Sequence, residues 1–333
     1  MKEPALKLTQ LEIGHQQKAG RKIVLLPPIN IALSESSLVA LAGINGAGKT
    51  TLLKTITGLH QPISGDIELF GFQPNKLSRS ELAKMVSIVL TDIADDFYLR
   101  TEDVVAMGRY PHLGFWGKLK TADKTIVEDA MYKCGIAHLI GRRLISLSDG
   151  ERQKTFIAKA IAQDTPLIVL DEPSAFLDYP GKLELMTLLR NLVREQQKTI
   201  LFSSHDLDLL MRFADQLWLI SPSKPIISGS PELLASSGKI GEYFNRNNLA
   251  FNSITGKFQS ENSSAQSVFV DRNVTHYYWV VNALNRNGFA LSKHDTVGFH
   301  VSDQDGNYKL TMADKQYICA DIDELIHQIL KQC

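Results

Sequence analysis

A glycine-rich stretch at residues 43–50 has the spacing of a phosphate-binding loop. It reads GINGAGKT and fits the pattern G-x-x-x-x-G-K-S/T. In such a loop, glycines let backbone N–H groups curl around phosphates, Lys49 places a charge on the β and γ phosphates, and the Thr50 hydroxyl binds magnesium. A glycine-rich turn without a ligand is the alternative, but the stretch lies between an apolar run and a helical pattern, as phosphate binding requires. The expected nucleotide-binding residues are Gly43, Asn45, Gly46, Ala47, Gly48, Lys49, Thr50 and Thr51.

Two acidic residues follow a second apolar run, in the stretch LIVLDEP at residues 167–173. An acid at the carboxyl end of a buried strand can hold magnesium through water, and a second acid can polarise a hydrolytic water. We therefore assign Asp171 to the metal and Glu172 to the water. Both acids could instead cap the next element, but the phosphate-binding loop elsewhere in the chain favours the catalytic interpretation.

A histidine, His205, follows another apolar run in the stretch FSSHDL. A lone histidine is more often a surface or core residue, but the carboxyl end of a parallel sheet would place this one beside a γ-phosphate. Its imidazole could donate a hydrogen bond to a phosphate oxygen. His205 is therefore the second expected catalytic residue, together with Glu172.

The stretch LSDGERQK, residues 147–154, combines a helix start with a second glycine-containing anion site. Ser148 and Glu151 have the S-x-x-E spacing of a capping box, so they could simply begin the helix that follows. A capped and exposed helix start beside Gly150 can also bind an anion, through its free N–H groups and the helix dipole. The two interpretations are compatible.

Alternating strand and helix patterns are expected to position these residues. Apolar runs at 38–43, 167–172, 198–204 and 217–221 predict strands, and segments 49–59, 183–197 and 206–216 have helical periodicity. This alternation predicts an α/β fold with a mostly parallel sheet that is covered by helices on both faces. Residues from about 101 to 163 show helical patterns without a convincing strand, which predicts a helical insertion.

A change in composition marks a boundary near residue 249. Residues 245–266 are rich in Asn, Ser and Gln, which is typical of a linker. Beyond it, strand and helix patterns predict a small C-terminal α+β domain. We expect a nucleotide-binding domain at 1–244, with its helical insertion at about 101–163, and an accessory domain at 249–333. The accessory domain is expected to enlarge the subunit interface, and a regulatory role is the alternative.

The 333-residue chain is balanced in charge, with 36 Lys and Arg against 36 Asp and Glu. The chain therefore lacks the excess of positive charge that is typical of proteins that bind nucleic acid or an anionic membrane surface. No apolar run approaches the roughly 20 residues of a membrane span, and the amino end lacks a signal-peptide core, so we expect a cytoplasmic chain. Cys134, Cys319 and Cys333 are scattered without metal-ligand spacing, which suits reduced thiols.

Taken together, the motifs resemble the nucleotide-binding subunit of ATP-binding-cassette (ABC) transporters, in that family's order and over roughly the first 240 residues. GINGAGKT resembles its P-loop and LIVLDEP its Walker B strand with the catalytic acid. LSDGERQ resembles its signature loop, SAFLD its D-loop with Asp178, and FSSHD its switch histidine. The resemblance implies an ABC-type P-loop NTPase fold, ATP and Mg2+ as cofactors, and ATP hydrolysis as the activity.

The resemblance also implies a homodimer with two ATP molecules between its subunits. In that family two subunits pack head to tail, and the signature loop of one closes on the γ-phosphate that the other binds. Ser148, Asp149, Gly150 and Glu151 would then contact the ATP of the partner subunit. Closure on ATP and opening after hydrolysis would do work on an attached partner.

Three features depart from the family pattern. Thr91 stands where the family has a glutamine that touches magnesium, and its shorter hydroxyl would reach the metal only through water. His15 stands where an aromatic residue stacks on adenine, and an exposed turn histidine is the alternative. In the signature loop, Asp149 and Glu151 replace the commoner glycine and glutamine.

The segment GRYPHLGFWG, residues 108–117, is similar to a stretch in ABC subunits that power uptake of iron–siderophore complexes, haem and cobalamin. A loop whose aromatic residues pack into the core is the alternative. The resemblance implies the ATPase subunit of a metal-chelate importer, peripheral on the inner face of the cell membrane. Its partners would be two integral-membrane permease subunits and, indirectly, an external substrate-binding protein. The competing hypotheses are a soluble ABC-type mechanical ATPase and a regulatory nucleotide-binding protein, and the cargo stays open.

Overall fold

The computed structural model describes residues 4–16, 22–91, 98–114, 117–245, 249–253, 256–260, 266–292, 294, 298–312 and 315–332. Contacts divide the chain into two compact units. Unit 1 comprises residues 1–245 and 251–258, and unit 2 comprises residues 246–250 and 259–333. The domain bounds 1–244 and 249–333 stay a prediction. Three groups of residues named above lie outside the described ranges. They are Phe115 and Trp116 of the segment GRYPHLGFWG, several residues of the expected linker, and Cys333.

A six-stranded sheet forms the centre of unit 1, in the order β11–β10–β5–β9–β8–β7. Its strands are β5 (Leu38–Gly43), β7 (Val86–Val89), β8 (Leu167–Leu170), β9 (Thr199–Ser204), β10 (Gln216–Ser221) and β11 (Lys224–Gly229). All neighbouring pairs are parallel except β10 with β11. Strands β5, β8 and β9 are buried along their whole length, because their apolar runs meet side chains on both faces. The predicted α/β fold with a mostly parallel sheet is confirmed.

The central sheet divides the core of unit 1 into two clusters, and helices cover each of them. On one face, α1 (Lys49–Ile56) packs its Leu52 and Leu53 with Val39 and Leu41 of β5. We name this side the P-loop face. On the other face, α6 (Tyr179–Gln196) and α7 (Leu207–Phe213) pack with the alternate side chains of the same strands. Because successive side chains of a strand point to opposite faces, the register decides which cluster each residue joins.

A three-stranded antiparallel sheet, which the sequence analysis did not predict, joins the core on the P-loop face. Its order is β4 (Ile29–Leu33), β1 (Leu6–Glu12) and β6 (Ser64–Leu69). A hairpin of β2 (Gly14–Gln16) and β3 (Lys22–Val24) follows β1. The alternation in β1 is short and interrupted by a register shift, so the strand pattern is weak in the sequence.

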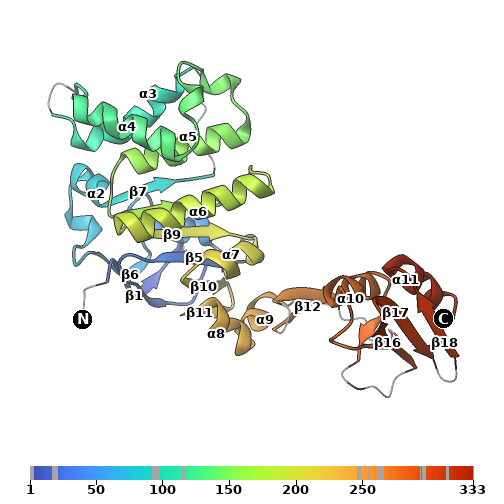
Figure 1. Cartoon of the computed structure of the whole chain (residues 1–333). Helices are drawn as coiled ribbons and strands as arrows, with labels where there is room; N and C mark the ends of the chain where they lie inside the picture. Colours follow the sequence, from blue (N-terminus) through green and yellow to red (C-terminus); the bar gives the residue numbers. More distant parts are fainter. Residues whose placement is uncertain are drawn as a thin grey trace. The chain divides into compact units, whose positions relative to one another are not determined.

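The segment 101–163 forms the predicted helical insertion. It contains α3 (Thr101–Ala106), α4 (Thr121–Lys133), α5 (Asp149–Ala162) and the 3-10 turns η2 (Met107–His112), η3 (Ala137–Leu139) and η4 (Leu144–Ser146). Figure 1 shows α3, α4 and α5 gathered at one end of unit 1, beyond β7 and α2 (Arg79–Met85). The described part of this segment holds no strand. The residue limits of the insertion stay a prediction.

The last part of unit 1 consists of short elements. They are α8 (Pro231–Ser236) and α9 (Lys239–Phe244), followed by the paired strands β12 (Leu249–Asn252) and β13 (Lys257–Ser260), of which residues 251–252 and 257–258 belong to unit 1. The rings of Phe244 and Phe251 each pack on Phe258, with 6.3 and 5.4 Å between centres. All three phenylalanines contact the core cluster of α6 and α7. The chain therefore contributes to unit 1 beyond α9.

Unit 2 has a separate sheet and a separate core. Its strands, in the order β15–β14–β16–β17–β18, are β14 (Ser267–Val270), β15 (Ala290–Leu291), β16 (Phe299–Gln304), β17 (Asn307–Met312) and β18 (Lys315–Cys319). The helices α10 (Tyr277–Arg286) and α11 (Ile322–Leu330) pack on one face of this sheet, around Leu284, Val301 and Leu325. The predicted α+β composition is confirmed. Across the described ranges of the whole chain, no helix has the length and hydropathy to cross a bilayer.

Candidate functional site

The loop between β5 and α1 turns on two glycines. Gly46 and Gly48 have φ angles of 78° and 94°, a left-handed backbone that is costly for residues with a Cβ atom. The Ala47 N–H donates to the Ile44 carbonyl at 3.1 Å and closes the turn. Helix α1 begins directly after Gly48, so the unpaired N–H groups of its first turn border the loop. Residues 43–51 thus form one continuous segment that can bind an anion.

Lys49 is folded back over this loop. Its Nζ donates to the carbonyl oxygens of Gly43 at 2.9 Å and Ile44 at 3.4 Å, and lies 3.7 Å from Oε1 of Glu172. Only 8% of the side chain is exposed. A buried ammonium group needs oxygen partners of this kind. Phosphate oxygens would serve the same purpose at the same place.

The Asp171 carboxylate follows β8 and contacts side chains from two other elements. Its Oδ2 accepts a hydrogen bond from the Thr50 hydroxyl at 2.7 Å, and its Oδ1 accepts one from the Ser203 hydroxyl at 2.6 Å. Asp171 is 2% exposed. It continues the alternation of Val169, which belongs to the core cluster on the P-loop face. Thr50 and Asp171, both predicted to bind a metal, are therefore in direct contact.

Glu172 lies between a lysine and a histidine. Its Oε2 lies 2.8 Å from Nδ1 of His205, and its Oε1 faces Lys49. The side chain of Glu172 is 17% exposed and that of His205 is 62% exposed. The acid is therefore sheltered while the imidazole faces solvent. A carboxylate held at both oxygens, next to a lysine that lies over the P-loop, can orient a water molecule.

Ser203 also belongs to this site, although the sequence did not predict it. The serine lies in β9, and its hydroxyl contacts both predicted acids, Asp171 through the carboxylate and Glu172 through the main-chain N–H. A signal was available, because Ser203 follows Leu201 on the P-loop face, where an apolar residue would continue the core. The pairing of β8 with β9 was needed to reveal its partners.

Thr91 also contacts the predicted metal site. Its hydroxyl donates to the main-chain carbonyl of Asp171 at 3.1 Å. The main-chain N–H of Asp171 donates to the carbonyl of Val89 at 2.8 Å. Residues at the end of β7 therefore hold the backbone of Asp171 from both sides, and the Thr91 hydroxyl is directed at that backbone.

His15 lies in β2, and its exposed ring is 6.4 Å from that of His60. The chain just before it borders the P-loop, because a Cβ atom built on Gly48 would lie 3.9 Å from Cδ1 of Ile13. An exposed imidazole near this loop suits a residue that stacks on a base. His15 is thus in a strand and not in a turn.

The signature segment begins α5 with a complete capping box. Ser148 Oγ accepts a hydrogen bond from the Glu151 N–H at 3.3 Å, and Glu151 Oε2 accepts one from the Ser148 N–H at 2.8 Å. This backbone hydrogen bond from Ser148 lowers the pKa of the Glu151 carboxyl. Asp149 is 63% exposed and pairs with Arg152. The predicted capping box is present, at a helix start that solvent reaches.

The signature segment lies against the D-loop. A Cβ atom built on Gly150 would lie 3.2 Å from the carbonyl oxygen of Phe176 and from Cδ2 of Leu177. Asp178 ends the D-loop by capping α6, since its Oδ1 accepts a hydrogen bond from the Gly181 N–H at 3.0 Å. Among the described hydrogen bonds and ion pairs, none joins residues 148–151 to residues 43–51.

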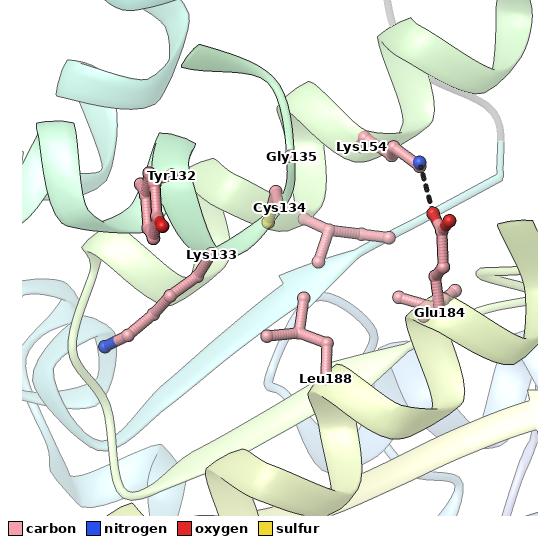
Figure 2. Close-up of a pocket in the computed structure, with 9 residues that line it drawn as sticks. Tyr132, Lys133, Cys134, Gly135, Lys154, Glu184 and Leu188 are labelled. Atoms are coloured by element: carbon pink, nitrogen blue, oxygen red, sulfur yellow. Dashed lines mark hydrogen bonds and ion pairs between the residues drawn. The ribbon is translucent and has the colours of Figure 1, made fainter.

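A pocket of about 230 Å³ lies apart from these residues, between α4, α5 and α6 (Figure 2). Figure 2 shows the ion pair of Lys154 with Glu184, 3.3 Å long, on one side and Tyr132 on the other. Burial raises the pKa of the Cys134 thiol in this pocket to about 12. Its walls include Ile157 and Leu188. No predicted site residue lines it.

A parallel sheet with a P-loop at the end of one strand, β5, and paired acids at the end of another, β8, defines a P-loop ATPase. The chain belongs to the ABC transporter family of ATP-binding proteins. The family model described as "ABC transporter" matches residues 26–175. A second model, described as "Iron ABC transporter C-terminal domain", matches residues 266–330, within unit 2.

The chain is similar to named relatives over most of unit 1. It is 34% identical over 258 residues to an uncharacterised ABC transporter ATP-binding protein of Methanocaldococcus jannaschii, covering 78% of this chain and 87% of the relative. It is 33% identical to the iron(3+)-hydroxamate import ATP-binding protein of Bacillus subtilis, covering 68% of this chain and 82% of the relative. A solved structure described as an inward-facing metal-chelate type ABC transporter matches with a TM-score of 0.61 at 29% identity, covering 73% of this chain and 89% of that one.

Proposed function

We propose that this chain is the ATP-hydrolysing subunit of an importer for a metal-chelate nutrient such as a ferric siderophore, haem or cobalamin. The observation that carries the proposed ATP hydrolysis is the cluster of Lys49, Glu172 and His205 beside the P-loop, and the importer class rests on the relatives discussed below. The main-chain N–H groups of residues 43–51 would bind the ATP phosphates, with Lys49 on the β and γ phosphates. His15 would stack on the adenine.

The oxygen atoms beside the P-loop fit a magnesium ion. Thr50 Oγ1 and Asp171 Oδ2 are 2.7 Å apart, close to the roughly 3 Å between adjacent ligands of octahedral Mg2+. The ion would neutralise charge on the β and γ phosphates. Thr50 would bind it through the hydroxyl and Asp171 through its carboxylate, directly or by way of water. Thr91, directed at the Asp171 backbone, would support that acid and not bind the metal itself.

Glu172 and His205 would act on the hydrolytic step. Glu172 would polarise and orient the attacking water, since its carboxylate is sheltered and held at both oxygens. With Nδ1 donating to Glu172, the ring of His205 needs a second proton, on Nε2, to donate to a γ-phosphate oxygen. Lys49 would stay on the phosphates while the charge redistributes.

A homodimer would complete each ATP site. Ser148, Asp149, Gly150 and Glu151 form an exposed helix start that no described hydrogen bond or ion pair joins to the P-loop of its own chain, and it would serve the ATP of a second copy. Exposed apolar side chains adjoin this helix start and the D-loop, namely Ile145 at 57%, Phe176 at 49% and Tyr179 at 57%. Asp178 would hold the D-loop at that interface. Burial of these side chains in a dimer would favour closure.

Two findings support the importer class. They are the names of several relatives and the match of residues 266–330, in unit 2, to the model described as "Iron ABC transporter C-terminal domain". One relative is named for iron(3+)-hydroxamate import, another for ferric enterobactin transport, and a third for cobalamin import. The chain covers 58% of the length of the cobalamin relative, from Halobacterium salinarum. We infer that two copies work beneath two permease subunits at the inner face of the cell membrane, with a substrate-binding protein outside. The cargo would not contact this chain.

The test is extraction of membranes that carry a tagged copy with mild detergent, followed by mass spectrometry of the co-purifying proteins. A polytopic membrane protein in about equal amount is expected, and its identity would indicate the cargo. The Glu172→Gln variant should retain the same partner, because the interaction does not depend on hydrolysis. Recovery of the tagged chain without any membrane protein would favour a soluble mechanical ATPase or a regulatory nucleotide-binding protein.

A further inference from the structure

Ser203 is fully buried at the carboxyl end of β9, directly beside β8. Its side chain continues the alternation of Leu201 on the P-loop face, and Ser204 continues the alternation of Phe202 on the opposite face. Two consecutive serines therefore serve different sides of the sheet. Only Ser203 is directed toward the two acids that follow β8.

The Ser203 hydroxyl has one proton, and its contacts use both its donor and its acceptor capacity. It donates to Oδ1 of Asp171 at 2.6 Å and accepts from the main-chain N–H of Glu172 at 2.8 Å. Oδ2 of Asp171 remains for Thr50. One hydroxyl thus sets the orientation of the Asp171 carboxylate and ties down the backbone of the next residue.

The backbone of Glu172 is one that needs such support. Its φ angle is 46°, in the left-handed region that a residue with a Cβ atom adopts only when its surroundings hold it there. Among the described hydrogen bonds, that of the Glu172 N–H goes to Ser203. This backbone conformation directs the Glu172 side chain to Lys49 and His205. Strain at a functional residue is therefore balanced by a neighbouring strand.

We propose that Ser203 is a positioning residue for ATP hydrolysis, which links the metal-binding acid Asp171 to the catalytic acid Glu172. The inference rests on the proposed function and extends it to a residue that touches neither nucleotide nor metal. Ser203 keeps the Asp171 carboxylate aligned with Thr50 and keeps Glu172 in its left-handed conformation. Lys49 and the P-loop do not depend on it, because they belong to another strand and helix.

The test compares Ser203→Ala with Ser204→Ala as the matched control. Ser204 is equally buried on the same strand, and its hydroxyl accepts from the Asp206 N–H at 3.1 Å, away from both acids. We expect Ser203→Ala to lower kcat about 10- to 100-fold, because a catalytic group displaced by about 1 Å costs up to that factor. The KM for ATP should change less than about threefold, since ATP binding rests mainly on the P-loop. Ser204→Ala should keep kcat within about twofold.

A second measurement is independent of turnover. Binding of a fluorescent ATP analogue is titrated in EDTA and again with Mg2+. Ser203→Ala should bind like the wild type in EDTA and should lose about two- to threefold of the affinity that Mg2+ adds, because the Asp171 carboxylate is no longer held. Should Ser203→Ala not fold, Ser203→Cys replaces it. Its thiol is a weak donor and acceptor of nearly the same size, and the same changes are expected.

Two results would overturn the inference. The first is a kcat of Ser203→Ala, or of Ser203→Cys, that equals that of the wild type. The second is an equal loss in Ser204→Ala, which would indicate a general effect of mutating β9. A wild-type chain without ATP hydrolysis would instead contradict the proposed function, so the two failures are distinguishable.

Discussion

At the scale of single residues, the charge on Glu172 organises the site. One oxygen of its carboxylate faces Lys49 at 3.7 Å and the other faces His205 at 2.8 Å. An amide of the same shape would keep one oxygen but lose the charge and the second acceptor. The role proposed for Glu172 therefore depends on ionisation, while ATP binding depends on residues 43–51.

We predict that Glu172→Gln lowers ATP turnover by roughly 100-fold or more, the range typical for loss of a general base. ATP binding should remain, and an ATP-bound dimer should accumulate because closure is no longer followed by hydrolysis. Phosphate release and size-exclusion chromatography with ATP measure the two effects. Glu195→Gln, on the exposed side of α6, is the matched control and should behave as the wild type. Unchanged hydrolysis by Glu172→Gln would disprove the assignment of the catalytic acid.

Cys134 lines the pocket of Figure 2 and should nevertheless be unreactive at neutral pH. Burial raises the pKa of its thiol from 9.0 to about 12, and only the thiolate reacts with alkylating agents. The contribution of this buried thiol to the free energy of unfolding is fully present below pH 9.0. It decreases as the pH rises toward 12. Mass spectrometry should show no alkylation of Cys134 at pH 8 in the folded protein and full alkylation in urea. Rapid labelling of the folded protein would contradict this.

At the scale of elements, α5 connects the signature segment to the segment that marked the importer subfamily. Its amino end is the capping box at Ser148. At its carboxyl end, Arg109 Nη1 donates to the carbonyl of Ala162, and His112 Nε2 lies 2.8 Å from the carbonyl of Gln163. Nε of Arg109, which is 6% exposed, also pairs with Asp123 at 3.0 Å. Part of the segment GRYPHLGFWG thus fixes one end of a helix whose other end is the proposed contact to ATP of a second copy.

We predict that Arg109→Met destabilises the protein more than the double variant Arg109→Met/Asp123→Leu. The single variant leaves the Asp123 carboxylate without its cation, and the double variant removes both charges. Backbone hydrogen bonding from Lys120 and, next, the Arg109 side chain lower the pKa of Asp123. The stabilisation from the pair is therefore present at neutral pH and is lost as the pH falls through that lowered pKa.

Urea unfolding at pH 7 and at acid pH measures these differences. The effect of Arg109→Met should become smaller in acid. Lys133→Met, which breaks the surface pair of Lys133 with Asp129, is the control and should cost less than about 0.5 kcal/mol. A double variant as unstable as the single one would show that the pair matters through packing and not through charge.

At the scale of the whole molecule, the two units have separate cores. The core of unit 2 contains none of the residues assigned to ATP, and its sheet pairs only with itself among the described strands. The aromatic cluster of Phe244, Phe251 and Phe258 belongs to unit 1 although it follows α8. The stability of unit 1 in a truncated chain should therefore depend on whether the truncation retains this aromatic cluster.

We predict that a chain ending after Ser260 hydrolyses ATP within about threefold of the full chain. A chain ending after Asn245 loses Phe251 and Phe258, and should lose roughly 2 kcal/mol of stability, or about 4–8 °C in Tm. Thermal melts and phosphate release measure both. Loss of hydrolysis in the chain that ends after Ser260 would assign unit 2 a part in catalysis.

The sequence by itself determined the features that depend on local spacing. The turn through Gly46 and Gly48, the capping box of Ser148 and Glu151, and the buried parallel strands follow from backbone sterics and apolar periodicity, which act over a few residues. The class of protein followed from the order of these motifs along the chain. That much of the fold and of the site was therefore predictable.

Only the tertiary structure decided which side chains support the predicted ones. Ser203 meets Asp171 because β9 pairs with β8 in a particular register, 32 residues along the chain. The contact of Arg109 with the end of α5 joins residues that are 53 positions apart in the sequence. The three-stranded sheet likewise depends on pairing between β1 and β6. Such contacts depend on long-range packing, in which a shift of one residue turns each side chain to the other face. Spacing within a motif contains no information about them.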